Sequence, residues 1–382
     1  MAFVLGVATA ADPAERRTPI VPEVANKLRA LGATLLIQRG ATGRANITDF
    51  DLGEATWVDT TEEVMAGSDV VWTIGPPTAE AIAAMRPGAV LIGLLAPFAD
   101  PARVTALATG GVDAFALELL PRISRAQAMD VLSSQGAAAG YQAALIAAAR
   151  APKFFPMLTY AAGTVRPAKV LVIGAGVAGL QAIATAKRLG AVVEGYDVRP
   201  ETKEQVESLG ARFVDTGVSA AGAGGYAREL TEDETNAQAA ALGKAVAGAD
   251  VLITTAAVPG RRAPLIVTEM MVNAMRPGAV IVDLAAESGG NVAGTVAGKE
   301  VRVGPAHLVG PVNLPSRMPV HTSEMFARNL LNFFTPMVVD QAVRIDTSDE
   351  VVAGAALTLD GTVVNPLVRQ ALGLDQPEGR DD

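Results

Sequence analysis

The chain has 382 residues; half are hydrophobic, only 4% are aromatic, and 31 basic against 40 acidic residues give a net charge of −9. Its length exceeds what one hydrophobic core usually organises, so we expect two domains. The acidic balance argues against a nucleic-acid partner, and zero cysteines with only two histidines argue against disulfides and metal centres. Because no run approaches the ~18 uninterrupted apolar residues of a membrane helix, we expect a cytoplasmic protein without direct membrane insertion.

The first third of the chain alternates apolar runs with short helical patterns, which is typical of a parallel α/β sheet. Strands are predicted at 3–8, 33–38, 69–74, 88–95 and 113–118, and helices at 22–31, 61–66, 78–85 and 101–108. From Arg125 to Arg150 the pattern predicts one long helix, capped by Ser124 and ended near Pro152. A helix of this length is suited to join two domains.

The second half repeats this organisation. Strands are predicted at 169–173, 191–196, 211–215, 251–255, 279–284 and 300–303. A helix at about 323–335, with Ser323 as its cap, is expected to carry the chain back to the first domain. The fold class is therefore α/β, with two Rossmann-like, doubly wound parallel-sheet domains joined by long helices.

An internal repeat supports this division. Residues 66–73 parallel 247–254, and Ala84–Val90 recurs letter for letter as Ala274–Val280. Each copy predicts a strand, a loop, a helix, a Pro-Gly stop and another strand. Duplication of one half explains the repeat, and chance similarity of two common βα units is the alternative.

Residues 169–197 combine a buried strand, a glycine turn, an amphipathic helix, a second strand and a terminal acid. Gly174 permits a tight turn, Gly176 lets the backbone approach a pyrophosphate, and Gly179 lets the helix pack closely on the strand. The free amides at the helix start attract phosphates. Asp197 can accept from both ribose hydroxyls and would repel a 2′-phosphate, which favours NAD(H) over NADP(H). The alternative is a glycine turn that binds nothing.

Two further segments stand out. The stretch 217–238 is longer than a usual βα connection and carries Tyr226 after a Gly/Ala-rich run, so it predicts a lid; a tyrosine on a surface insert is the alternative.

In the segment 121–130, Arg122, Gln127 and Asp130 place a guanidinium, an amide and a carboxylate where they can fix a planar group such as a carboxamide. A capped helix with surface salt bridges is the alternative there.

The chain resembles the NAD(H)-binding subunits of proton-translocating nicotinamide nucleotide transhydrogenases, which are relatives of alanine dehydrogenase. The resemblance covers nearly the whole chain and depends on residues 121–135, 163–165, 203–210, 224–226 and 329–333. It implies a homodimer of chains with two Rossmann-like domains. The first would combine residues 1–124 with 336–382, and the NAD(H)-binding domain would be 125–335.

The resemblance also implies which residues contact the nucleotide. Arg122, Gln127 and Asp130 would hold the nicotinamide ring and its ribose as the catalytic, ring-orienting groups, with Ile123, Ser124, Ala128 and Met129 lining the site. Around the pyrophosphate and adenosine ribose it implies Val177, Asp197, Val198 and Arg199, beside the glycines of the turn. At the mobile loop and the end of a later strand it implies Gly225, Tyr226, Gln238 and Ala257.

Proton chemistry separates this chain from the amino-acid dehydrogenases. Alanine dehydrogenases supply a lysine after the third strand and a histidine after the fourth, and the matching positions here are Thr73 and Leu94. A lysine-glutamate pair usual near the start of the superfamily is replaced by Thr9 and Ala10, while Glu15 and Arg17 remain. Neither Thr73 nor Leu94 can act as a general base or carry a charge, whereas hydride transfer between two nicotinamides needs no acid or base.

We therefore expect the proton-translocating, Si-specific/Re-specific type of NAD(P) transhydrogenase, with NAD(H) on this chain and NADP(H) on a partner subunit. The resemblance implies membrane-spanning subunits that hold the chain at the inner face of the plasma membrane. An NAD-dependent amino-acid dehydrogenase of the alanine type is the enzyme alternative. An NAD(H)-responsive binding module without hydride transfer is the other.

Overall fold

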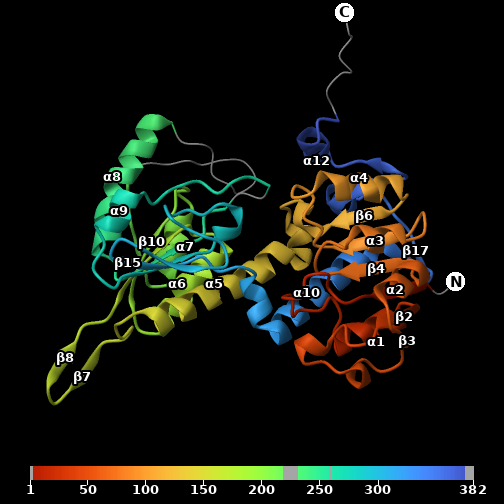
Figure 1. The fold of residues 1–382 in the computed structure, drawn as a ribbon, viewed down its shortest axis with the longest axis horizontal. Helices are drawn as coiled ribbons and strands as arrows, with labels where there is room; N and C mark the ends of the chain where they lie inside the picture. Colours follow the sequence, from red (N-terminus) through yellow and green to blue (C-terminus); the bar gives the residue numbers. More distant parts are fainter. Residues whose placement is uncertain (1–2, 218–230, 258–259, 375–382) are drawn as a thin grey trace, which may run out of the picture. The chain divides into compact units, whose positions relative to one another are not determined.

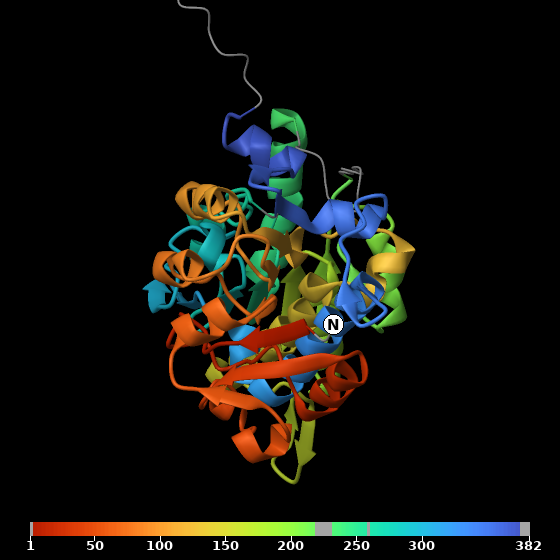
Figure 2. The same ribbon diagram turned by 90° about the vertical axis from the view of Figure 1, so that its right-hand side faces the viewer.

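The computed structural model describes residues 3–217, 231–257 and 260–374. The chain divides into two compact units, unit 1 with Met1–Gln135 and Ser316–Asp382, and unit 2 with Gly136–Pro315 (Figure 1). Segments from both ends of the chain, red to orange and blue in Figure 2, therefore lie in unit 1. The domain boundaries expected from the sequence, at 124/125 and 335/336, stay a prediction.

Unit 1 contains an α/β sheet that, in the described part of the chain, has the order β19-β18-β6-β5-β4-β1-β2-β3. All neighbours are parallel except at β18 and β19, which add an antiparallel edge. The strands are β1 (Phe3–Val7), β2 (Ala33–Gln38), β3 (Thr56–Val58), β4 (Val70–Thr73), β5 (Val90–Gly93), β6 (Asp113–Ala116), β18 (Ala356–Leu359) and β19 (Thr362–Val363). The helices are α1 (Pro22–Ala30), α2 (Thr61–Gly67), α3 (Ala79–Ala83), α4 (Pro101–Thr109), α10 (Pro319–Phe334), α11 (Glu350–Ala355) and α12 (Pro366–Ala371).

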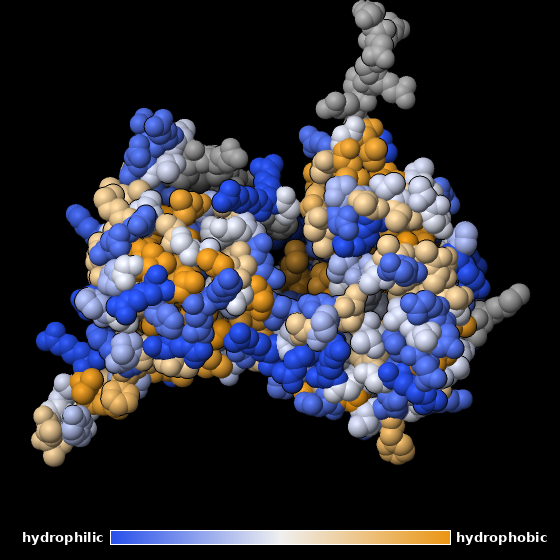
Figure 3. Space-filling model, in the orientation of Figure 1, coloured by the Kyte–Doolittle hydropathy of each residue, from blue (hydrophilic) through white to orange (hydrophobic). Residues whose placement is uncertain are grey.

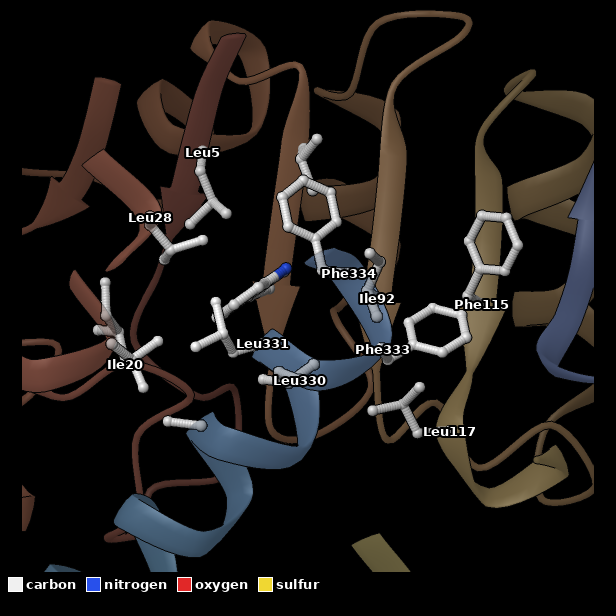
Figure 4. Packing of buried hydrophobic residues seen from close by; sticks show 14 of the residues in the cluster. Leu5, Ile20, Leu28, Ile92, Phe115, Leu117, Leu330, Leu331, Phe333 and Phe334 are labelled. Carbon is white, nitrogen blue, oxygen red and sulfur yellow. The ribbon is translucent and has the colours of Figure 1, made fainter. Parts of the chain in front are cut away.

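Helix α10 fills the largest core of unit 1. Its residues Phe326, Leu330, Phe333 and Phe334 are buried among side chains of the sheet, as Figure 4 shows for the last three of these. Phe334 meets Trp72 of β4 edge-on, with ring centroids 5.7 Å apart. Because an aromatic cluster of this kind leaves few alternative packings, α10 is a rigid element of unit 1.

Unit 2 contains a second sheet, in the order β11-β10-β9-β12-β13-β15-β14 and parallel except at β14. Its strands are β9 (Lys169–Ile173), β10 (Val192–Tyr196), β11 (Arg212–Phe213), β12 (Val251–Thr254), β13 (Val280–Asp283), β14 (Glu300–Val303) and β15 (Ala306–Val309). Its helices are α6 (Val177–Arg188), α7 (Thr202–Ser208), α8 (Glu232–Gly248), α9 (Glu269–Asn273) and most of α5 (Val131–Arg150). A hairpin of β7 (Leu158–Tyr160) and β8 (Gly163–Val165) projects from this unit (Figure 1). A second short hairpin, β16 (Val338–Val339) with β17 (Ala342–Val343), belongs to unit 1.

The predicted α/β class is confirmed, and both copies of the repeat form the predicted strand, helix and strand. Two predicted helix caps are wrong. Ser124 does not cap a helix that begins at Arg125; it is the first residue of a 3-10 helix, Ser124–Met129, and α5 begins at Val131 after Asp130. Ser323 lies inside α10, which begins four residues earlier at Pro319, because proline at the first helical position needs no N–H partner.

Candidate functional site

The glycine turn of unit 2 joins β9 to α6. Gly174 has a left-handed φ of +95°, and a Cβ there would lie 2.5 Å from Thr255 Oγ1. A Cβ on Gly179 would lie 1.7 Å from the carbonyl oxygen of Gly174, so only glycine lets the helix approach the turn this closely. Thr255 fixes the other side of the turn, since its hydroxyl donates to that same carbonyl at 2.9 Å.

Gly176 is the N-cap of α6, and Val177, the first residue of the helix, is 45% exposed. The nearest atom to a Cβ on Gly176 is Arg199 Nη2 at 3.9 Å, so the space over this peptide is open. The first turn of a helix leaves backbone N–H groups outside the intrahelical pattern, at the positive end of the helix dipole. This part of unit 2 therefore fits a pyrophosphate group.

Asp197 follows β10 and is buried. Its carboxylate accepts from the Ala175 N–H at 2.7 Å and from the Arg199 N–H at 2.9 Å. The Arg199 guanidinium also grips it, through Nε at 2.9 Å and Nη2 at 2.8 Å. Asp197 thus stands at the predicted place beside the glycine turn, but a ribose would compete with Arg199 for its oxygens. This ion pair was not predicted from the sequence.

The end of β12 is held by residues that were not predicted as part of the site. The Asn291 amide accepts from the Ala256 N–H at 3.0 Å and donates to the Ala256 carbonyl at 2.7 Å. Asp283, fully buried, accepts in turn from the backbone N–H of Asn291 at 2.8 Å. This relay fixes the backbone next to the exposed Ala257, the predicted contact. In the sequence, the Gly-Gly-Asn run at 289–291 is the feature that could have pointed to Asn291.

The remaining predicted residues of unit 2 differ in burial and in hydrogen bonding. Gln238 is buried in α8 and donates to the Tyr196 hydroxyl at 2.8 Å, so it braces the end of β10. Burial raises the pKa of that tyrosine. Val198 is half-buried. Gly225 and Tyr226 lie outside the described residues, and the lid stays a prediction.

In unit 1 the segment 122–130 presents its polar groups outward. Arg122, Ser124, Gln127 and Ala128 are exposed, Ile123 is half-buried, and Met129 is buried in the core. Asp130 follows the 3-10 helix Ser124–Met129 as its C-cap, with an extended backbone. Asp130 is half-buried and is the true cap of α5: it accepts from the Ser133 N–H at 2.9 Å and from its hydroxyl at 2.5 Å. Ser133 was not predicted.

The positions matching the dehydrogenase bases hold no proton-transfer group. The Thr73 hydroxyl donates to the Gly75 carbonyl at 2.6 Å, and Leu94 packs against the core of unit 1. Glu15 and Arg17 form a buried ion pair, with Arg17 Nη2 2.6 Å from Glu15 Oε2. We interpret this pair as a contact that stabilises the fold.

A titrating carboxyl group, that of Glu118, contacts the two residues after Leu94 and was not predicted from the sequence. Glu118, just after β6, accepts from the N–H groups of Leu95 and Ala96 through Oε1. Although part of the residue is accessible, Oε2 is buried without a hydrogen-bond partner among the described residues. Burial raises the pKa of Glu118 to about 7. A carboxyl oxygen sealed in this way cannot exchange a proton with a substrate without a structural change.

Among the described residues, His, Cys, Asp and Glu form no cluster able to ligate a metal. Over the same ranges no helix has the length and hydropathy needed to cross a bilayer. The two sheets, the glycine turn and the acid after the second strand define a two-domain, Rossmann-like nucleotide-binding protein.

Comparison with known proteins narrows this class. The chain matches the alanine dehydrogenase/PNT N-terminal domain over residues 6–139 and the corresponding C-terminal domain over residues 143–366. It belongs to the alanine dehydrogenase/PNT family. It is 47% identical to an NAD(P) transhydrogenase alpha-subunit polypeptide of Rhodospirillum rubrum, over 93% of this chain and 96% of the relative. Alanine dehydrogenase of Mycobacterium tuberculosis is 31% identical, over 75% of this chain and 73% of the relative.

A solved transhydrogenase structure has the same fold. The transhydrogenase from Sinorhizobium meliloti superposes with a TM-score of 0.84 at 41% identity, covering 95% of this chain and 99% of that chain. The expected fold and the resemblance to transhydrogenase subunits are confirmed.

Proposed function

We propose that this chain is the NAD(H)-binding subunit of a proton-translocating NAD(P) transhydrogenase of the Si-specific/Re-specific type. Two observations carry the proposal: unit 2 has a glycine turn whose geometry fits a pyrophosphate, and the strand ends of unit 1 offer Thr73 and Leu94 instead of a proton-transfer pair. The higher identity to a transhydrogenase subunit, 47% against 31% for an alanine dehydrogenase, supports it.

Each unit would contribute a different part of the binding. In unit 2 the amides at the start of α6 bind the pyrophosphate, and Asp197 exchanges Arg199 for the ribose hydroxyls. Val177, Val198, Gln238 and Ala257 complete that contact set. In unit 1 Arg122, Gln127 and Asp130 hold the nicotinamide end, with Ile123, Ser124, Ala128 and Met129 beside it. Gly225 and Tyr226 would cover the nucleotide and exclude water.

When bound, NAD(H) supplies or accepts the hydride, and NADP(H) on a partner subunit is the other reactant. The work of this chain is then orientation: it holds the ring in a reactive geometry and moves no proton itself. Membrane-spanning subunits would couple the step to proton movement and hold the chain at the inner face of the plasma membrane.

We also propose that the chain forms a homodimer through the β7–β8 hairpin. Met157 and Tyr160 are 62% and 60% exposed there, and in Figure 3 orange and tan atoms are mixed with white and pale blue ones on this arm at the lower left. A two-stranded hairpin is marginal by itself in water, and exposed apolar residues mark interfaces. Sedimentation equilibrium tests this: wild type should be a dimer, and Met157→Ser/Tyr160→Ser should shift it toward monomer. A wild-type monomer would contradict the proposal.

The functional test mixes the protein with an NADP(H)-binding transhydrogenase subunit and follows reduction of an NAD⁺ analogue by NADPH. Transfer that requires both proteins supports the proposal. Formation of NADH from NAD⁺ and L-alanine by this chain alone would establish the dehydrogenase alternative instead. Nucleotide binding without either reaction would leave a binding module.

A further inference from the structure

The carbonyl oxygen of Ala128 is held by two side chains of α10. Asn329 Nδ2 donates to it at 2.8 Å and Asn332 Nδ2 at 2.9 Å. Ala128 lies between Gln127 and Asp130, at the end of a short 3-10 helix whose last carbonyls have no intrahelical donor. One donor would satisfy such a carbonyl. Two donors from successive turns of α10 fix the peptide in position as well.

Asn329 is itself fixed. It is only 8% exposed, and its Oδ1 accepts from the Ser134 hydroxyl at 2.7 Å, which orients its amide nitrogen toward Ala128. Ser134 Oγ accepts from Gln135 Nε2 at 3.2 Å, and Gln135 accepts from Arg17 Nη1 at 2.9 Å. A partly buried hydrogen-bond network therefore fixes the orientation of this asparagine. Asn332 differs, because it is exposed on the same helix.

The apolar face of α10, which adjoins the two asparagines, holds the helix in place. Phe326, Leu330, Phe333 and Phe334 are buried in the core of unit 1, each at 1% exposure or less. Figure 4 shows the last three of these. The helix cannot shift without disturbing that packing. The segment carrying Gln127 and Asp130 is thus tied to a helix that is packed firmly into the core of its unit.

We propose that Asn329 and Asn332 are positioning residues for hydride transfer, which act through the Ala128 peptide on Gln127 and Asp130. This inference rests on the proposed function. Neither asparagine needs to touch the nucleotide. Hydride transfer depends steeply on ring geometry, whereas most of the affinity for NADH would come from the pyrophosphate and adenosine contacts in unit 2. Removing the two donors should therefore lower kcat and spare binding.

The test measures kcat of reconstituted transfer and, separately, the Kd for NADH by calorimetry. Asn332→Ala should lower kcat about fivefold, and Asn329→Ala/Asn332→Ala more than about tenfold, with Kd changed less than about twofold. Asn332→Asp replaces the donor by an acceptor and should be no faster than Asn332→Ala, whereas Asn332→Gln keeps a donor and should recover part of the rate. His321→Ala, at an exposed position of the same helix, is the matched control and should transfer at the wild-type rate.

The outcomes separate this inference from the function on which it rests. Absence of hydride transfer in the reconstituted wild-type system would contradict the proposed function. Wild-type transfer with an unchanged kcat in both Asn332→Ala and Asn332→Asp would overturn the positioning role, as would a fall in kcat matched by an equal loss of NADH affinity. If the double variant does not fold, the two exposed single substitutions decide, because Asn332 is not part of the core.

Discussion

Asp69 and Asp250 make the same backbone contact in different units. Asp69 Oδ2 accepts from the Val4 N–H of β1 at 2.7 Å, and Asp250 Oδ2 accepts from the Lys169 N–H of β9 at 3.0 Å. Each aspartate directly precedes the strand that pairs with that first strand. The contact ties the starts of two neighbouring parallel strands together, and its recurrence supports the interpretation of the two halves as duplicates.

Burial and a second cation make the Asp250 site stronger than the Asp69 site. Arg86 pairs with Asp69, whose side chain is 46% exposed, while Arg276 and Lys153 both pair with Asp250, whose side chain is 8% exposed. Asp250→Asn should therefore cost about 2 kcal/mol of unfolding free energy and Asp69→Asn at most about 1. Urea unfolding of the two variants checks this. Equal losses would contradict the expected difference.

Acid should remove the advantage of Asp250. Burial alone would raise its pKa, but hydrogen bonds from Lys153 and the Lys169 N–H, with the charges of Lys153 and Arg276, lower it overall from 3.8. A carboxyl with a lowered folded-state pKa stabilises above its unfolded value, and that stabilisation is lost as the pH falls through the folded value. The gap between wild type and Asp250→Asn should close below pH 3.8. A gap that stays constant down to pH 2 would count against this pairing.

Glu118 predicts the opposite pH dependence. Its folded-state pKa is about 7 against an ordinary value of 4.5, so between these values the folded chain binds more protons than the unfolded chain. The free energy of unfolding should therefore fall as pH rises across this window, by up to about 3 kcal/mol. Glu118→Gln should lose that slope and exceed wild type in stability at pH 8. Glu62→Gln, exposed on α2, is the control and should keep the slope; a Glu118→Gln slope like that of wild type would refute the assignment.

Substitutions at two glycines of the turn should have different effects, one on stability and the other on NADH binding. Gly179→Ala forces a methyl group onto the Gly174 carbonyl and should lower Tm sharply. Gly176→Ala meets open space, so Tm should stay within a few degrees of wild type. Its methyl group would stand where the pyrophosphate approaches, and Kd for NADH should rise about tenfold or more. Unchanged NADH affinity in Gly176→Ala would place the phosphates elsewhere.

Asp197 should decide the choice of cofactor. In Asp197→Asn the repulsion of a 2′-phosphate disappears and Arg199 loses its charged partner, becoming available to that phosphate. NADH affinity should fall about tenfold while NADPH affinity rises, so the ratio of the two Kd values shrinks. Calorimetric titration with both nucleotides measures it, with Glu201→Gln, exposed at the start of α7, as the control. A ratio unchanged from wild type would show that Asp197 does not face the ribose.

Most of the fold was predictable because its information is local. Strand Lys169–Ile173 was predicted to the residue, since a buried parallel strand is one continuous apolar run. The glycine turn was readable because left-handed backbone and close approach demand glycine. The cap at Ser124 was predicted wrongly because residue type alone does not identify a cap. Ser124 and Asp130 are equally good cap residues by type, and only the end of the 3-10 helix at Met129 decides between them.

The supports of the site were not predictable. Asn329 and Ala128 are separated by 201 positions in sequence, so nothing local marks their hydrogen bond. The ion pair of Arg199 with Asp197 depends on a rotamer, and the raised pKa of Glu118 depends on how β5 and β6 end together. Such contacts come from tertiary packing, which sequence periodicity does not encode.

Direct passage of a hydride from one nicotinamide to another is the central claim, and isotope transfer tests it most directly. NADPH carrying deuterium at the reactive C4 position is mixed with an NAD⁺ analogue, this chain and an NADP(H)-binding subunit, in ordinary water. We expect the reduced analogue to carry the deuterium almost quantitatively, with no amino acid required. Reduced analogue containing solvent hydrogen instead, or reduction that depends on an added amino acid, would contradict direct transfer.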